Sequence, residues 1–399
     1  MKTYSRNAIQ EVETSTAIIR PRMPELDSLR GVAVLMVLFY HGFFWSNTLQ
    51  GLTGVKRIFV SVTSCGWLGV NLFFVLSGFL ITGILIDSRL DPHYFRKFYV
   101  RRALRILPAF YALLVLLAFN GFRGHYYLLS SFFYLSNLTP LWGVAMTYPM
   151  LWSLAVEEHF YLVWPALLRK LSANAIPKLV LAIVIAEPIL RMMSFLLGRR
   201  TGLSYYTWLV ADGLALGAAL AFYFRQPHFS RHRVAQISIG LVTLACLMAS
   251  FGTPYGIFTR QRLLGSGLQL TMFNLLFAGL LGITLLLGTS RYRFLVNRPG
   301  LVFFGNISYG LYLIHWMVFA WYDRFVSFRW PGSFPIAGRF GLMTLRFAIV
   351  SAVAVLIACM SRRYFEEPFL QLKERFAEPV AERASGTPVQ QYGNCVSEL

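Results

Sequence analysis

The chain has 399 residues, of which 56% are hydrophobic and 14% are charged, whereas about a quarter of a soluble protein is charged. This composition excludes an ordinary soluble domain and indicates a membrane protein. The formal charge of +20 does not indicate nucleic-acid binding, because the basic residues lie between apolar segments rather than in one patch. The 4 cysteines stand singly, without the spacing of a metal site or a redox pair, so we expect no metal and no structural disulfide.

The first 25 residues are polar. They contain Glu11, Glu13 and Glu25 and lack the apolar core of a secretory signal. We therefore expect residues 1–25 to be retained as a cytoplasmic N-terminal segment.

Apolar stretches of membrane-spanning length recur along the rest of the chain. A bilayer core of about 30 Å takes about 20 helical residues to cross. This predicts an all-α, polytopic transmembrane helix bundle of about ten spans around a central cavity, the spans lying near 28–45, 67–86, 104–119, 151–168, 179–197, 205–224, 234–251, 268–288, 300–320 and 340–360. A weaker candidate, 126–142, is interrupted by Ser131, Asn137 and Pro140, and we expect it to be a re-entrant or surface piece.

Ten spans put both ends of the chain on one side of the membrane. When the loops are assigned alternately, most of the 37 Lys and Arg residues fall on that side, which the positive-inside rule makes cytoplasmic. An eleventh span over 126–142 would spoil this asymmetry. We expect a multi-pass protein of the bacterial inner membrane with a transmembrane domain over 26–363, both termini in the cytoplasm, and a polar, partly disordered tail over 364–399.

The first predicted span carries an arginine and a histidine on one face. Arg30 and His41 are 11 positions apart, which is three helical turns plus about 20°, so they project from the same side about 16 Å apart. One helix could thus touch both ends of a long ligand.

A basic cluster opens the third predicted span. The run FRKFYVRRALRILP (95–108) supplies Arg101, Arg102 and Arg105, whose guanidinium forks could hold phosphates. Anchoring of a cytoplasmic loop would also explain this cluster. What favours the phosphate interpretation is that acid and base residues are expected higher in the membrane, within reach of the other end of a long ligand whose phosphates the arginines hold.

Several separate spans carry titratable residues to a similar depth. An ionisable side chain at mid-membrane costs about 2.5–3.5 kcal/mol on insertion scales. Each one alone could be a buried packing contact, but a layer supplied by different helices is typical of acid–base chemistry. Its members are His41, Glu157, Glu158, Asp212 and His315.

Glu157 belongs to a polar helix face. Ser153 precedes it by four residues and Tyr161 follows it by four, whereas Glu158 points about 100° away. The pattern predicts a cavity-lining helix on which the Glu157 carboxylate accepts a hydrogen bond from an imidazole.

Two other charged positions lie within predicted spans. Glu187 and Arg191 are four residues apart, and we interpret them as a structural ion pair. Arg346 has no local partner and faces either the cavity or another helix.

Five motifs, in order, resemble the acyltransferase-3 family of integral-membrane O-acyltransferases, and the resemblance runs from about residue 24 to 370. They are LDSLRGVAVLMVLFYH (26–41), GVNLFFVLSGFLIT (69–82), FYVRRALRILPAF (98–110), LWSLAVEEHFYLVWP (151–165) and ISYGLYLIHW (307–316). The resemblance implies a cytoplasmic acyl-CoA donor, usually acetyl-CoA, and a hydroxyl acceptor on an extracytoplasmic glycan, glycolipid or other molecule. It also implies donor-binding roles for Arg30, Arg102 and Arg105 and an essential role for His41.

We therefore expect a membrane O-acyltransferase in which His41 and Glu157 are catalytic. His41 would act as general base oriented by Glu157, or would form an acyl-histidine. Candidate substrate-binding or supporting residues are Ser153, Glu158, Tyr161, Asp212, His315 and Asn71. The alternatives are a transporter or flippase, an acyltransferase for macrolide-type small molecules, and a non-catalytic membrane scaffold.

Overall fold

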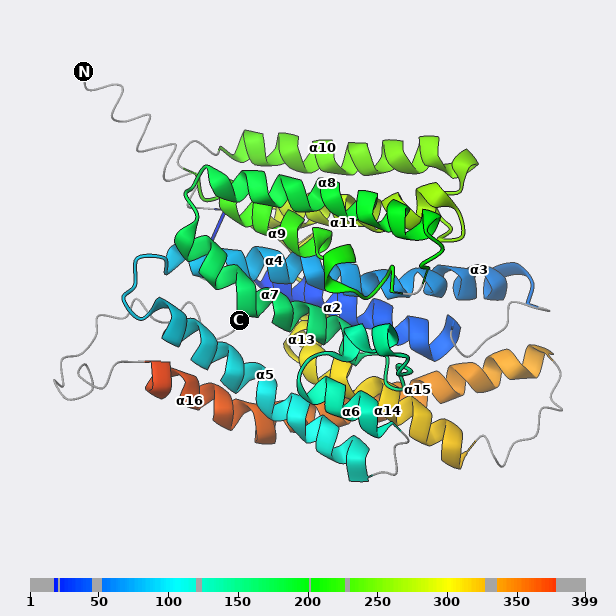
Figure 1. Ribbon diagram of the computed structural model, residues 1–399. Helices are drawn as coiled ribbons and strands as arrows, with labels where there is room; N and C mark the ends of the chain where they lie inside the picture. The colour runs from blue at the N-terminus through cyan, green and yellow to red at the C-terminus, as the bar shows by residue number, and fades with distance from the viewer. Residues whose placement is uncertain are drawn as a thin grey trace, which may run out of the picture.

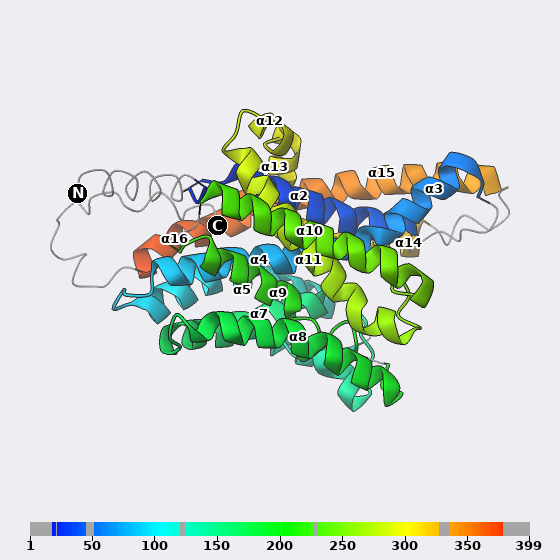
Figure 2. The same ribbon diagram turned by 90° about the horizontal axis from the view of Figure 1, so that it is seen from above.

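The computed structural model describes residues 18–20, 22–44, 52–119, 124–200, 202–226, 230–326 and 336–377. These residues form helices and no strand, so the predicted all-α polytopic bundle is confirmed. The long helices run side by side along roughly one direction in both views (Figures 1 and 2). Most of the N-terminal segment predicted over 1–25, and the tail from residue 378 onward, lie outside the described residues.

The helices are numbered in chain order. The first half of the chain forms α2 (Pro24–Phe39), α3 (Gly54–Thr63), α4 (Gly69–Asp87), α5 (Tyr94–Phe119), α6 (His125–Phe132), α7 (Leu151–Lys170) and α8 (Ala175–Leu196). The second half forms α9 (Asp212–Tyr223), α10 (Arg231–Gly252), α11 (Leu263–Gly288), α12 (Arg293–Val296), α13 (Pro299–Asn306), α14 (Ser308–Phe325), α15 (Ile336–Met360) and α16 (Glu367–Ala377).

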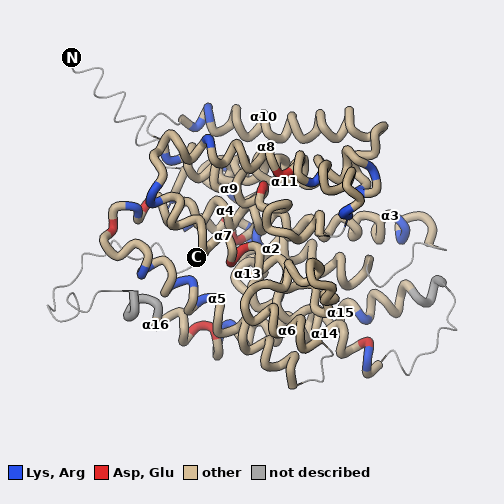
Figure 3. Tube along the Cα trace, viewed as in Figure 1, with Lys and Arg blue, Asp and Glu red and all other residues tan. Residues whose placement is uncertain are grey.

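Helices of membrane-spanning character dominate the described part of the chain. Seven are long and apolar enough to cross a bilayer, and the bent pair α13–α14 makes eight. The other two predicted spans correspond to α7, which has 20 residues but includes Glu157 and Glu158, and to α9, which has 12 residues. The long helices carry most of their Lys and Arg positions near their ends (Figure 3), as expected for a multi-pass membrane protein.

Two predicted spans are broken rather than continuous. In the span predicted over 205–224, helix α9 begins at Asp212, after a short 3₁₀ turn (Thr207–Leu209). In the span predicted over 300–320, the chain bends by 74° between α13 and α14. Non-helical backbone at membrane depth must have its polar groups satisfied by protein. At the first break, the Glu187 carboxylate of α8 accepts hydrogen bonds from the backbone N–H groups of Ala211 and Asp212.

The weak segment 126–142 does not form a long helix. It consists of the 8-residue α6 and a 3₁₀ helix (Ser136–Trp142). Asn137 is fully buried and donates hydrogen bonds to the Tyr205 carbonyl at 3.1 Å and to the Thr207 hydroxyl at 3.0 Å. The segment thus packs against the irregular start of the broken sixth predicted span, and the expectation that it does not form a span is confirmed.

Helix α4 lies at the centre of the bundle and packs closely along α9. A Cβ atom on Gly78 would collide with the backbone of Leu214, and one on Gly217 with that of Val75. Small residues allow this close approach of helix backbones within membranes. Helix α4 also packs against α2, α7 and α11, so its side chains face several neighbouring helices.

Helical structure extends beyond two of the predicted spans. Helix α3 joins α4 through a 3₁₀ turn, so a continuous helical segment runs from Gly54 to Asp87, beginning well before the predicted start at residue 67. After α15 the chain passes through a π-helical turn (Ser361–Glu366) into α16, which packs along α5. The first part of the predicted tail is therefore helical as far as Ala377.

Candidate functional site

A first cavity, called here the arginine cavity, opens between α2, α4, α5, α7 and α14. It contains about 920 Å³ of empty space, including its opening. Its charged lining residues are Arg30, Arg102, Arg105, Glu157 and Glu158. The structure thus brings together the three arginines and the two carboxylates that the sequence places on three separate helices.

The arginines of this cavity are poorly matched by carboxylates. Arg30 lies 3.4 Å from Asp27. Arg102 packs over the rings of Phe98 and Tyr161, and neither Arg102 nor Arg105 forms an ion pair among the described residues. Unpaired guanidinium groups in a half-buried cavity favour an anionic ligand.

A buried hydroxyl also faces the arginine cavity. Ser308 begins α14 and is 1% exposed, and its Oγ has no hydrogen-bond partner among the described residues. Buried polar groups in proteins are nearly always satisfied, so an orphan hydroxyl on a cavity wall is a further indication of a polar ligand.

Glu157 is held by neighbours other than an imidazole. Its two carboxylate oxygens accept hydrogen bonds from the Ser77 hydroxyl at 3.1 Å and from the Tyr161 hydroxyl at 2.9 Å. Ser153, Glu157 and Tyr161 line one cavity wall, as their spacing predicts. Within the described ranges no imidazole donates to Glu157, so that expectation is wrong: α4 supplies Ser77 at this level, and His41 lines a different compartment.

That second compartment, called here the histidine cavity, contains about 1940 Å³ of empty space, including its opening. It is rich in aromatic rings and in neutral polar groups. Besides His41, its lining includes Tyr40, Trp67, Trp152, Tyr205, Asn71, Ser204, Gln261, Gln269 and Arg260. Aromatic faces combined with hydrogen-bonding side chains suit a polar organic ligand.

The two cavities share a wall. Val70 and Phe74 of α4 and Tyr312 of α14 line both of them. The Tyr312 hydroxyl lies 2.6 Å from the Ser153 hydroxyl of α7. The sequence predicts a single central cavity, and the structure corrects this: there are two compartments, because a few side chains form a common wall between them, which we call the septum.

His41 pairs with His315. Nδ1 of His41 lies 3.2 Å from Nε2 of His315 and 3.0 Å from the Val37 carbonyl oxygen. Nδ1 of His315 lies 3.1 Å from the Leu311 carbonyl oxygen and 2.8 Å from the Tyr312 carbonyl oxygen. Of the predicted acid–base layer, these two histidines are in direct contact.

The partners of the two rings assign their protons. Carbonyl oxygens only accept, so His315 carries its proton on Nδ1 and has a lone pair on Nε2. This lone pair and the nearer Val37 carbonyl oxygen are both acceptors beside Nδ1 of His41, so the His41 proton is on Nδ1 and is shared between them. Neutral His41 then has the basic lone pair on Nε2, which is the arrangement a general base needs.

His41 lies on a distorted turn that Arg346 anchors. Residues Tyr40–Phe44 form a π-helical turn after α2, a feature often found at functional sites. Arg346 of α15 donates to the Gly42 carbonyl at 3.1 Å and pairs with Asp323 through two bonds of 2.6 Å. Arg346, which has no partner in the local sequence, thus ties α14 and α15 to the turn that carries His41.

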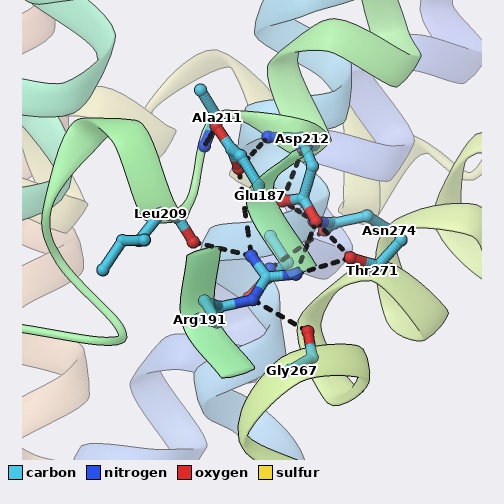
Figure 4. Close-up of polar contacts among 10 residues, drawn as sticks. Glu187, Arg191, Leu209, Ala211, Asp212, Gly267, Thr271 and Asn274 are labelled. Carbon is cyan, nitrogen blue, oxygen red and sulfur yellow. Dashed lines mark hydrogen bonds and ion pairs between the residues drawn. The ribbon is translucent and has the colours of Figure 1, made fainter. Parts of the chain in front are cut away.

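Asp212 belongs to a buried ionic network rather than to the layer of the histidines. It accepts from Arg191 at 3.0 Å, and Arg191 also donates to Thr271 and to the Leu209 and Gly267 carbonyls (Figure 4). Glu187 lies 3.9 Å from Arg191 and accepts from the backbone N–H groups of Ala211 and Asp212. The predicted ion pair of Glu187 with Arg191 is thus part of a larger network that caps the start of α9.

Asn71 connects this network to the histidine cavity. Its side-chain amide donates to Asn274 at 2.9 Å, and Asn274 donates to Asp212 at 2.8 Å. Asn71 also lines the histidine cavity. It therefore has a supporting place beside the site, whereas Asp212 is completely buried behind it.

Several residues of the site carry no strong signal in the sequence. Ser77 binds Glu157 and Tyr312 binds Ser153, but single hydroxyls on apolar helices are common and do not by themselves indicate a site. Helical spacing does indicate which way they face. Ser77 lies seven positions after Val70 on one face of α4, and Tyr312 lies three positions before His315 on one face of α14. Arg260 lies in a loop, where helical spacing gives no indication of which residues face a cavity.

Comparison with known proteins assigns the chain to a family. The family model described as "Acyltransferase domain" matches residues 23–362. The peptidoglycan O-acetyltransferase OatA of Listeria monocytogenes is 29% identical over 394 residues, covering 90% of this chain and 57% of that protein. The O-acetyltransferase OatA of Staphylococcus aureus is 27% identical over 375 residues, covering 87% of this chain and 57% of that protein.

The chain thus spans little more than half the length of these curated relatives. No solved structure matches it. The family match covers the residues that line both cavities, and it favours an enzyme over a transporter or a scaffold. The chain belongs to the acyltransferase-3 family of membrane acyltransferases.

Proposed function

We propose that this protein transfers an acetyl group from cytoplasmic acetyl-CoA to a hydroxyl group of a glycan or glycolipid on the other side of the bacterial inner membrane. The observation that carries the proposal is the pair of cavities, one lined by arginines and one by His41, which meet at the septum. The two compartments match a reaction whose substrates arrive from opposite sides.

The arginine cavity suits the donor. The phosphates of coenzyme A need cationic partners, and Arg102 and Arg105 offer guanidinium groups that no described carboxylate pairs. Arg30 adds a third at the same cavity. The positive-inside rule supports a cytoplasmic opening, since Arg89, Arg96 and Lys97 lie beside the start of α5.

The histidine pair supplies the chemistry. His41 Nε2 takes the proton of the acceptor hydroxyl as its oxygen attacks the thioester carbonyl. The carbon–sulfur bond breaks, and the coenzyme A thiolate leaves with the proton that His41 Nε2 took up, which returns His41 to its neutral form. His315 accepts the hydrogen bond from His41 Nδ1 throughout, which fixes the ring and stabilises its positive charge.

Glu157 takes a different part in this scheme from the one expected from its sequence. It holds Tyr161 and Ser77 in the wall of the arginine cavity, close to the packing position of Arg102 over Tyr161. We assign it to shaping the donor site. Ser153 and Glu158 line the same cavity.

The acceptor side suits a carbohydrate. Rings of Trp67, Trp152 and Tyr205, together with neutral amides, offer the stacking faces and hydrogen bonds that sugar rings use. The names of the relatives, which are peptidoglycan or other O-acetyltransferases, support a glycan acceptor. A macrolide-type small molecule remains the competing acceptor class.

Two measurements test the proposal. Purified protein should be stabilised thermally by acetyl-CoA, and mass spectrometry should find acetyl esters on the surface glycans of the host only when a functional gene is present. His41→Ala should retain the stabilisation and lose the esters. Absence of stabilisation at millimolar acetyl-CoA, together with unchanged glycans, would refute the enzyme's proposed donor and acceptor.

A further inference from the structure

Arg260 is an unusual residue of the histidine cavity. It follows the short 3₁₀ helix Thr253–Tyr255 and precedes α11, and it is half-buried. Its guanidinium group lies 4.4 Å from the centre of the Trp67 ring, donates to the Ser204 hydroxyl at 2.5 Å and donates to the Gln269 side-chain oxygen at 3.2 Å. All four of these side chains line the cavity.

Arg260 differs from the other deep arginines in its charge balance. Arg191 is matched by Asp212, and Arg346 is matched by Asp323. Arg260 forms no ion pair in the described part of the chain, and both of its hydrogen-bond acceptors are neutral. A cation withdrawn from bulk water without a counter-charge is costly, so an anionic ligand would complete the site.

The backbone of the loop that carries Arg260 is held by several hydrogen bonds. Gln269 donates to the Phe258 carbonyl at 2.8 Å. The Ile257 N–H donates to the carbonyl of Gly252, which ends α10, and the Thr259 N–H donates to the Gly256 carbonyl. Gly256 turns the chain with a φ of +76°, which favours glycine. The guanidinium group is therefore pre-organised, which reduces the entropy cost of binding.

We propose that Arg260 binds an oxyanion, a carboxylate or a phosphate, carried by the acceptor glycan, while His41 in the same cavity engages the hydroxyl that is acetylated. The inference rests on the proposed function. Trp67 positions the guanidinium plane, and Ser204 and Gln269 hold its Nη1 and Nε groups. The Nη2 group, which has no hydrogen-bond partner within the described ranges, is the donor that meets the oxyanion.

The test compares acceptors that differ only in charge. Full-length protein in lipid nanodiscs is given saturating acetyl-CoA and a glucuronate-bearing oligosaccharide or its methyl ester. A second pair is a phosphorylated oligosaccharide and its dephosphorylated form. The variants are Arg260→Gln and Arg260→Lys, with Arg262→Gln as a control that removes the same charge from an exposed position of the same loop.

We expect the wild type to show a KM about tenfold lower for one anionic acceptor than for its neutral partner. Arg260→Gln should raise KM for that anion to the neutral value without changing KM for the neutral acceptor. Arg260→Lys should keep part of the preference, and Arg262→Gln all of it. The pair that responds identifies the oxyanion as carboxylate or phosphate.

Other outcomes contradict specific claims. Equal KM values of the wild type for charged and neutral acceptors, or an equal loss for both in Arg260→Gln, would overturn the role of Arg260 while leaving acetyl transfer intact. A wild type that transfers acetyl to none of these acceptors and does not bind acetyl-CoA would instead overturn the proposed function.

Discussion

Nδ1 of His41 lies 3.2 Å from Nε2 of His315, and this contact joins α14 to the π-helical turn after α2 across 274 positions of sequence. Because His315 donates through its other nitrogen to backbone carbonyls, it presents an acceptor to His41. His315, together with the Val37 carbonyl, therefore orients the His41 ring.

The histidine contact predicts a graded response at position 315. His315→Leu removes the acceptor and should lower kcat about 100-fold, within the range of general-base contributions, while KM for acetyl-CoA is unchanged. His315→Gln keeps an acceptor oxygen at a similar reach and should lose less. Steady-state kinetics on the two variants checks this, and equal rates for His315→Leu and wild type would contradict it.

The arginine cavity predicts a defect confined to the donor. Arg102→Gln and Arg105→Gln should each raise KM for acetyl-CoA about tenfold, because each removes a charge-assisted contact to phosphate. Arg96→Gln removes the same charge from an exposed position of α5 and serves as the control. Titration of acetyl-CoA against thermal stability measures binding directly. A similar loss in Arg96→Gln would mean that loop charge, rather than the cavity, matters.

The network of Arg191 with Asp212 predicts a large effect on stability. Arg191→Leu leaves a completely buried carboxylate without its cation and should lower the free energy of unfolding by about 3–5 kcal/mol. Adding Asp212→Asn removes that charge, so the double variant should be more stable than Arg191→Leu alone. Thermal unfolding of the detergent-solubilised variants tests this, and strictly additive losses would show that the two groups are not coupled.

Arg346 predicts a positioning effect on His41. Arg346→Gln should lower kcat with little change in KM for either substrate, because it releases the Gly42 carbonyl beside the catalytic histidine. Asp323→Asn keeps that bond and should be milder. Kinetics of both variants, at equal amounts of folded protein by size-exclusion chromatography, decides between them. A more severe defect in Asp323→Asn would mean that the ion pair, rather than the Gly42 contact, positions the turn.

The sequence predicts the parts of this site that depend on a single helix. The 11-residue spacing of Arg30 and His41, the four-residue spacing of Ser153, Glu157 and Tyr161, and the length of the apolar stretches follow from helical periodicity. Ser153, Glu157 and Tyr161 line one wall of the arginine cavity, as their spacing predicts. Arg30 and His41 line different cavities, because the α-helix ends at Phe39 and His41 lies on the π-helical turn that follows.

What could not be predicted depends on packing between distant segments. Either His315 or Glu157 could have met His41, and only the placement of α14 and α4 decides that His315 does. The break before Asp212 follows from the Glu187 carboxylate on α8, which replaces the lost intrahelical bonds. The division into two cavities depends on Val70, Phe74 and Tyr312, residues with no distinctive local pattern.

The most direct test of the account uses sealed vesicles with the protein in one orientation. Radiolabelled acetyl-CoA, which does not cross the bilayer, is supplied on the side of the arginine cavity, and the acceptor is enclosed on the side of the histidine cavity. We predict labelled acceptor with the wild type, and none with His41→Ala although this variant still binds acetyl-CoA. Label appearing on the enclosed acceptor at the wild-type rate with His41→Ala would contradict the central claim.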